Sequence, residues 1–279
     1  MRPCLSALER AAQRVIVGTA DPAAYAFYRR LTAHGYEPDR HIDVLPDHRL
    51  VYVCVPKCAS SRVKLTLSAL LGRTPVSRVE VNKRKLSGLN GPKHVGLSTF
   101  YRVATDPATL RFSFVRNPYA RLVSCWADKF RDRPLVPGQP SIDPYLTWRQ
   151  RNDPSLPHGA DRTLSFAEFV GMATTTASAR VDAHWQLQAD LLDMPGIALD
   201  LVGKMESFAL DFRPVLDHVG ADDVLRRRAL VPFNASQHSR WADYYTDELA
   251  AQVYRAYERD FDSFGYSRAL AGHPLALTG

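Results

Sequence analysis

A lysine and two serines follow the first strongly apolar segment of the chain. Residues 50–55 form a nearly continuous apolar run, which is typical of a strand buried on both faces, and Pro56 ends it. The next six positions are Lys57, Cys58, Ala59, Ser60, Ser61 and Arg62. The apolar spacing over 61–71 predicts a helix directly after them. A cation, hydroxyls and backbone N–H groups at a helix N-terminus can hold a phosphate or a sulfate, because helix N-termini attract anions.

A second predicted strand ends in an arginine. Residues 111–115 alternate like a strand, and Arg116 follows directly. An asparagine and a proline come next, which is typical of a helix start. Arg121 and Ser124 are three residues apart on that helix and share a face. An arginine with a serine can bind a phosphate through charge-assisted hydrogen bonds.

Further strands and helices alternate along the chain. Residues 197–202 indicate a third strand, and 208–219 a helix after it. A capping box at Ser165 and the apolar spacing over 246–261 predict two more helices. This order favours an α/β fold, with a parallel sheet flanked by helices on both faces. Ligands bind beyond the carboxyl ends of such strands, where both polar clusters are expected.

We expect a single domain over residues 1–279, since one α/β unit can reach this length. Residues 1–48 are predicted to form an N-terminal helical segment. Residues 131–162 contain prolines at positions 134, 137, 140, 144, 154 and 157, so regular structure is not expected there. A segment of that kind in a compact domain predicts a lid or an acceptor-binding loop.

Composition narrows the class of protein. The chain is 46% hydrophobic and 23% charged, which argues against disorder, collagen-like repeats and a disulfide scaffold. The net charge of +7 favours an anionic partner, which includes nucleic acid, a nucleotide, an acidic glycan or a membrane surface. No stretch approaches the roughly 20 apolar residues of a transmembrane helix. The four cysteines are expected to be reduced thiols, so we expect a cytoplasmic protein.

The two clusters together resemble sulfotransferases that use 3′-phosphoadenosine 5′-phosphosulfate (PAPS), specifically the carbohydrate group that contains the chondroitin and heparan 2-O-sulfotransferases. Lys57 and Ser61 match the first loop of that family. The residues that match its second loop are Arg116, Arg121, Ser124, Trp126, Lys129 and Phe130. Residues 182–188, 200–206 and 254–266 match its later motifs in order.

This resemblance implies a nucleotide-kinase-like, P-loop type of sheet and a PAPS donor. Residues 57–62 would hold the 5′-phosphosulfate. The residues implied on the 3′ side of the donor are Arg116, Arg121, Ser124, Ser236 and Arg240. The product would be adenosine 3′,5′-diphosphate, and the acceptor a hydroxyl of a carbohydrate or glycoconjugate that can be anionic. No metal is expected to be required.

Two features depart from the family pattern. Ser60 and Arg62 replace a glycine and a serine that many members carry in the first loop, so the loop is closer to a variant whose last residue is Lys64. The transmembrane anchor of the animal enzymes is missing, which fits a soluble, bacterial type of member.

The chemistry of sulfuryl transfer assigns further roles. The reaction resembles phosphoryl transfer, in which charge grows on the leaving oxygen, and Lys57 is the natural partner for that oxygen. The acceptor proton needs a base, and a histidine suits that task near neutral pH. His94 lies between the two loops in sequence, in the region that supplies a catalytic histidine in heparan 2-O-sulfotransferases. His184 is the alternative base, and a carboxylate is a third.

Two other classes of function stay open from the sequence. A P-loop kinase or nucleotide phosphotransferase is the first, although residues 51–71 lack the glycines of a Walker A loop. A non-catalytic basic protein that binds nucleic acid is the second, although no nucleic-acid-binding motif is present. The oligomeric state and the acceptor's identity cannot be deduced from the residues.

Overall fold

The strands form one sheet in the part of the chain that the computed structural model describes. The described residues are 21–33, 37–75, 77–134, 137–138, 142–152, 163–178, 182–230 and 241–270. The strands are β1 (Ile42–Leu45), β2 (Leu50–Val53), β3 (Leu110–Val115) and β4 (Leu201–Lys204). They lie side by side in this order; β2, β3 and β4 are parallel, and β1 is antiparallel to β2 at the edge. The predicted α/β fold is confirmed.

Two predictions about the strands need correction. The N-terminal segment 1–48, predicted to be helical, contains β1 after its helices α2 (Pro22–Ala33) and α3 (Pro38–His41). The third strand was predicted at 197–202 but is β4, which begins only at Leu201. The carboxylate of Asp200 binds the backbone N–H and the guanidinium of Arg111, at 2.8 and 2.9 Å, just before that strand begins.

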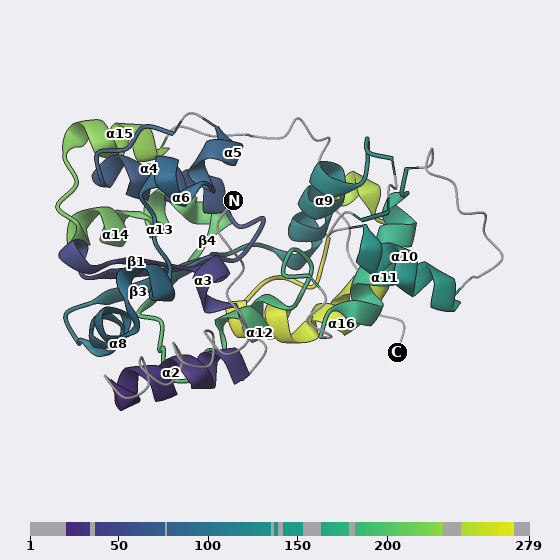
Figure 1. The fold of residues 1–279 in the computed structure, drawn as a ribbon. Helices are drawn as coiled ribbons and strands as arrows, with labels where there is room; N and C mark the ends of the chain where they lie inside the picture. The colour runs from purple at the N-terminus through teal and green to yellow at the C-terminus, as the bar shows by residue number, and fades with distance from the viewer. Residues whose placement is uncertain are drawn as a thin grey trace.

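Helices cover both faces of the sheet (Figure 1). Helices α2 and α8 (Leu97–Thr105) pack on one face, where Val51 and Val53 are buried. Helices α4 (Ser60–Leu70) and α14 (Arg213–His218) cover the opposite face, where Leu50 and Tyr52 are buried. Successive residues of a strand point to opposite faces, so β2 is apolar at every position. This is why the sheet appears in the sequence as a continuous apolar run.

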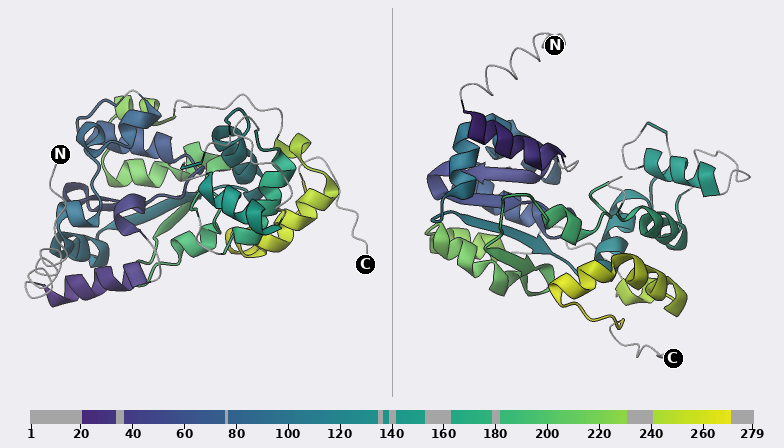
Figure 2. Two further views of the ribbon diagram at one scale, coloured as in Figure 1. Left: turned by 45° about the vertical axis from the view of Figure 1, so that its right-hand side comes forward. Right: turned by 90° about the horizontal axis from the view of Figure 1, so that it is seen from below.

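A second group of helices lies beyond the carboxyl ends of the parallel strands (Figures 1 and 2). Its helices are α9 (Pro118–Lys129), α10 (Asp143–Asn152), α11 (Phe166–Thr176) and α16 (Asp247–Phe264). They share an aromatic core, in which Phe130, Phe169 and Trp185 are fully buried. Helix α10 lies inside the proline-rich segment 131–162, so the prediction that this segment lacks regular structure is wrong for 143–152.

The predicted helix starts are confirmed. Asn117 caps α9 by accepting a hydrogen bond from the backbone N–H of Tyr119 at 3.0 Å, and Ser165 forms a capping box at α11. The helix predicted over 208–219 is divided at Phe212, because Pro214 has no N–H to continue the hydrogen-bond ladder. The remaining short helices are α5 (Arg78–Val81), α6 (Arg84–Ser87), α7 (Pro92–Val95), α12 (Gln188–Leu192), α13 (Phe208–Asp211) and α15 (Asp223–Leu230). Among the described residues, no helix combines the length and apolarity needed to span a membrane.

Candidate functional site

The first predicted loop is a tight turn between β2 and α4. Lys57 and Ala59 both have positive φ angles, 70° and 60°, although neither is a glycine. Such residues cost of order 1–3 kcal/mol each and cluster at functional sites. Ala59 is the N-cap of α4, and Ser60 and Ser61 are the first two residues of that helix. The turn thus places the first N–H groups of α4 and two hydroxyl residues next to Lys57.

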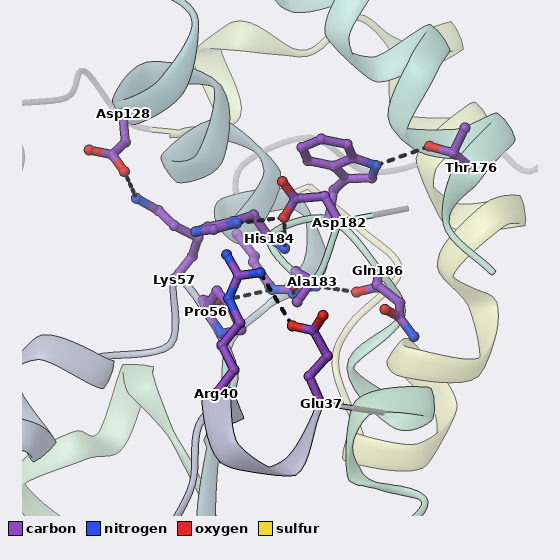
Figure 3. Close-up of polar contacts among 12 residues, drawn as sticks. Glu37, Arg40, Pro56, Lys57, Asp128, Thr176, Asp182, Ala183, His184 and Gln186 are labelled. Atoms are coloured by element: carbon purple, nitrogen blue, oxygen red, sulfur yellow. Dashed lines mark hydrogen bonds and ion pairs between the residues drawn. The ribbon is translucent and has the colours of Figure 1, made fainter. Parts of the chain in front are cut away.

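The Lys57 side chain extends from this turn toward α9 (Figure 3). Its Nζ lies 3.0 Å from Oδ2 of Asp128. The two side chains are only 12% and 16% exposed. An ion pair shielded in this way orients the ammonium more firmly than a pair in open water does. An anion at the loop would therefore compete with Asp128 for Lys57.

The second predicted loop meets the first directly. The guanidinium of Arg116 donates a 3.4 Å hydrogen bond to the carbonyl of Lys57. Burial lowers the pKa of Arg116, although an arginine stays protonated in proteins. Ser124 lies two turns into α9 and is 9% exposed. The strand ends thus bring Arg116 and Lys57 together, as the sequence predicts for parallel strands.

Arg121, another predicted donor ligand, is almost fully enclosed. It is 1% exposed. Its guanidinium donates to the carbonyls of Pro56, Ala183 and Gln186, at 3.1, 2.7 and 2.6 Å. These carbonyls belong to the first loop and to the segment before α12, so Arg121 joins three parts of the chain.

The other side chains of the first loop are also engaged. Cys58 is fully buried, and its thiol donates to Oε1 of Gln188 at 3.2 Å. Burial raises the pKa of this thiol to about 12, so it is neutral at pH 7. Arg62 Nε donates to the carbonyl of Ala229 at 2.8 Å, and its guanidinium lies 4.3 Å from the Phe208 ring centre. These side chains hold the loop in place, while its backbone and serines remain near Lys57.

His184 lies close enough to Lys57 for the charge of that lysine to act on its imidazole (Figure 3). Its Nδ1 lies 2.6 Å from Oδ1 of Asp182, which also accepts the backbone N–H of His184 at 2.8 Å. A carboxylate at this distance fixes the tautomer with the proton on Nδ1, which leaves the lone pair on Nε2. Burial lowers the pKa of His184, and the charges of Lys129 and Lys57 act in the same direction.

Asp182 opposes these effects on the imidazole. Its hydrogen bond and its charge raise the pKa of His184, but burial outweighs them. The same hydrogen bond lowers the pKa of Asp182 itself against the effect of burial. At neutral pH the pair is therefore a carboxylate and a neutral imidazole. Such a pair can accept a proton at Nε2.

His94, the predicted base, has a different environment. It lies on α7, its side chain is 48% exposed, and its Nδ1 is 3.7 Å from Oδ1 of Asp39. Helix α7 packs against α3 and the edge strand β1. Ser236 and Arg240, also predicted at the site, lie outside the described residues.

Two acidic residues of this cluster were not predicted from the sequence. Asp128 pairs with Lys57, and Asp182 pairs with His184. Asp128 lies four residues after Ser124, one turn along the same face of α9, which is the signal that could have indicated it. Within the described residues, no group of three or more His, Cys, Asp and Glu side chains is arranged to hold a metal ion.

Comparison with known proteins agrees with this geometry. The chain matches the sulfotransferase family over residues 40–267, a range that includes both loops and the Asp182–His184 pair. It is 29% identical over 241 residues to carbohydrate sulfotransferase 11 of Danio rerio, which covers 82% of this chain and 67% of that protein. It is 29% identical over 272 residues to carbohydrate sulfotransferase 8 of Homo sapiens, which covers 89% of this chain and 61% of that protein. No solved structure matches the chain. Because the family match spans well over half of the chain, this protein belongs to the sulfotransferase family and is a sulfotransferase.

Proposed function

We propose that this protein transfers the sulfuryl group of PAPS to a hydroxyl of a carbohydrate. The observation that carries the proposal is the direct contact between the two loops, in which Arg116 binds the carbonyl of Lys57. A nucleotide that carries one anionic group at the 5′ position and another at the 3′ position can reach both loops. The carbohydrate acceptor follows from the names of the relatives, and the basic net charge supports an acceptor that is itself anionic.

The donor ligands divide into direct contacts and supports. We assign the 5′-phosphosulfate to Lys57 and to the backbone and hydroxyls of Ser60 and Ser61. The 3′-phosphate is assigned to Arg116 and Ser124. The side chains of Arg121, Arg62 and Cys58 act as supports, because their polar atoms already bind the protein. The roles of Ser236 and Arg240 stay predictions.

Lys57 is assigned to the leaving oxygen. In the free protein its ammonium binds Asp128, and the donor's oxygens would offer it a competing partner. Negative charge grows on the bridging oxygen as the S–O bond breaks, so an ammonium placed there stabilises the transition state more than the ground state. The turn with positive φ at Lys57 fixes the backbone from which this side chain extends.

We reassign the general base from His94 to His184. His184 is neutral at pH 7, carries its lone pair on Nε2 and lies near Lys57. His94 is half exposed on α7 and pairs with Asp39. In the proposed step, Nε2 of His184 takes the proton of the acceptor hydroxyl while the hydroxyl oxygen attacks sulfur. The resulting imidazolium is stabilised by Asp182.

Three further expectations for this protein stay predictions. These are the cytoplasmic location, a reaction that needs no metal, and the single-domain organisation. The kinase and nucleic-acid-binding alternatives are not favoured, because the family match covers both loops.

The test is incubation with ³⁵S-labelled PAPS and a panel of polysaccharides, oligosaccharides and small hydroxyl compounds. We expect label in a carbohydrate product, and adenosine 3′,5′-diphosphate in equal amount. Binding of adenosine 3′,5′-diphosphate by calorimetry tests the donor separately. A protein that binds ATP–Mg²⁺ and not adenosine 3′,5′-diphosphate would overturn the proposal.

A further inference from the structure

Gln188 contacts both donor loops with one side chain. Its Oε1 accepts the backbone N–H of Arg116 at 2.9 Å and the thiol of Cys58 at 3.2 Å. Its Nε2 donates to the carbonyl of Arg116 at 2.9 Å. Gln188 is fully buried. The second loop is therefore held at both backbone atoms of Arg116, and the first loop at Cys58.

Asp260 fixes the orientation of this glutamine. This carboxylate, from α16, is fully buried and accepts three hydrogen bonds. Two come from the backbone N–H groups of Gln188 and Ala189, at 2.9 and 2.8 Å, and one from Nε2 of Gln188 at 3.2 Å. With the carboxylate beside Nε2, the amide nitrogen and oxygen can be told apart by their partners. The C-terminal helix thus orients the residue that joins the loops.

No other common side chain of this length satisfies the same partners. Arg116 presents both an N–H donor and a carbonyl acceptor, so the joining side chain must accept and donate at once. A carboxylate only accepts, and an ammonium only donates. An unpartnered polar group in this buried position would destabilise the arrangement. The chemistry of the contact therefore requires an amide.

We propose that Gln188, oriented by Asp260, is a positioning residue that sets the separation of the two donor loops and thereby the preference for a nucleotide carrying both a 5′ and a 3′ anionic group. This rests on the proposed donor. Binding two groups of one ligand is stronger than binding either alone only when the two sites are held at the right separation. A nucleotide with a single phosphate needs one loop only and does not depend on that separation.

The test compares two nucleotides by calorimetry. Adenosine 3′,5′-diphosphate engages both loops, and adenosine 5′-monophosphate engages the first loop alone. We expect Gln188→Met to lower the affinity for adenosine 3′,5′-diphosphate by about 10- to 100-fold, as is typical for loss of a residue that orients a ligand-binding group. Affinity for the monophosphate should change by less than about threefold. The ratio of the two affinities is a quantity that a general loss of stability does not change.

Gln252→Met is the matched control. Gln252 lies on α16, and its Nε2 donates at 2.9 Å to Oγ1 of Thr174 on α11 rather than to either loop. The Gln252→Met variant should bind adenosine 3′,5′-diphosphate and adenosine 5′-monophosphate with wild-type affinities. If Gln188→Met does not fold, Asp260→Asn, which keeps the size of the side chain and removes the carboxylate, provides the same comparison.

The outcomes are distinct. A wild-type protein that binds both nucleotides equally would refute the proposed donor. A wild-type preference that survives in the Gln188 and Asp260 variants would refute the positioning role alone. An equal loss of both affinities in these variants would also refute it, because Gln188 would then serve only the stability of the fold.

Discussion

Replacing His184 by glutamine tests its role as general base independently of donor binding. The substitution removes the imidazole and keeps a polar side chain of similar length. If His184 takes the acceptor proton, kcat should fall by about 10²- to 10⁴-fold. At 1.36 kcal/mol per decade, this corresponds to a barrier increase of about 2.7–5.4 kcal/mol. Affinity for adenosine 3′,5′-diphosphate should stay within about threefold, because His184 is not among the proposed phosphate ligands, which are Lys57, Ser60, Ser61, Arg116 and Ser124.

His94→Gln is the matched control, since the same change is made on α7. With His94 half exposed beside Asp39, this variant should keep wild-type turnover. The assay is sulfated product from labelled PAPS and the carbohydrate identified by the panel. Normal turnover after His184→Gln together with a collapse after His94→Gln would show that the base lies at the originally predicted position.

The pH dependence gives a second, independent readout. Burial, with Lys129 and Lys57, lowers the pKa of His184 below its ordinary value of 6.5, and Asp182 only partly offsets this. A protonated imidazole cannot accept a proton, so kcat/KM should fall on the acidic side with a midpoint below 6.5 and be flat near pH 7. Asp182→Asn removes the group that raises this pKa, so the acidic limb should move to lower pH. An unshifted limb would exclude the Asp182–His184 pair as its source.

Three further changes test the donor loops and the sheet. Arg116→Ala removes a charge-assisted bond of about 1.5–3 kcal/mol, so affinity for adenosine 3′,5′-diphosphate should fall about 10- to 150-fold by calorimetry. Lys57→Ala should lower kcat by about two to three decades while donor affinity falls much less; normal turnover would remove Lys57 from the leaving oxygen. Asp200→Asn should lower Tm at pH 7. Burial raises the pKa of Asp200, but its bonds to Arg111 prevail and hold that pKa below 3.8. The stabilisation is therefore present above pH 3.8 and lost as pH falls further, and Tm values of wild type and variant, followed by circular dichroism, should converge in acid.

Local signals explain why the first loop and the second loop could be predicted. Each is a buried strand followed by a turn and a helix within about 20 residues, and the N-caps predicted at Asn117 for α9 and at Ser165 for α11 are present. Strand β1 has no such local signal, because its four residues are stabilised by pairing with β2 and, at Val44, with Asn90. Helix α10 was missed because its Pro144 was counted as a breaker, whereas it occupies the second position of the helix, where a missing N–H costs nothing.

The base shows a different limit of sequence reasoning. His94 lies between the two loops in sequence, yet α7 attaches to the edge of the sheet through Asp39 and β1. His184 follows the strands of both loops by about 70 residues or more in sequence. Even so, Arg121 binds the carbonyls of Ala183 and Gln186 on either side of it. Those bonds hold the histidine's segment against the first loop. The contacts of a buried arginine therefore bring His184 near the first loop, and the spacing of residues in the sequence could not reveal those contacts.

Residues of the later sequence motifs bind the turn after β3. The backbone N–H of Arg116 is held by Gln188, which Asp260 orients. The next N–H, that of Asn117, is held at 2.8 Å by Glu206, whose other oxygen accepts the hydroxyl of Tyr266 at 3.0 Å. Two acceptors from different parts of the chain, each bonded to the C-terminal region, thus fix two successive N–H groups. A phosphate-binding arginine is useful only if its backbone does not move. Residues of the segments 182–188, 200–206 and 254–266 therefore hold this turn together.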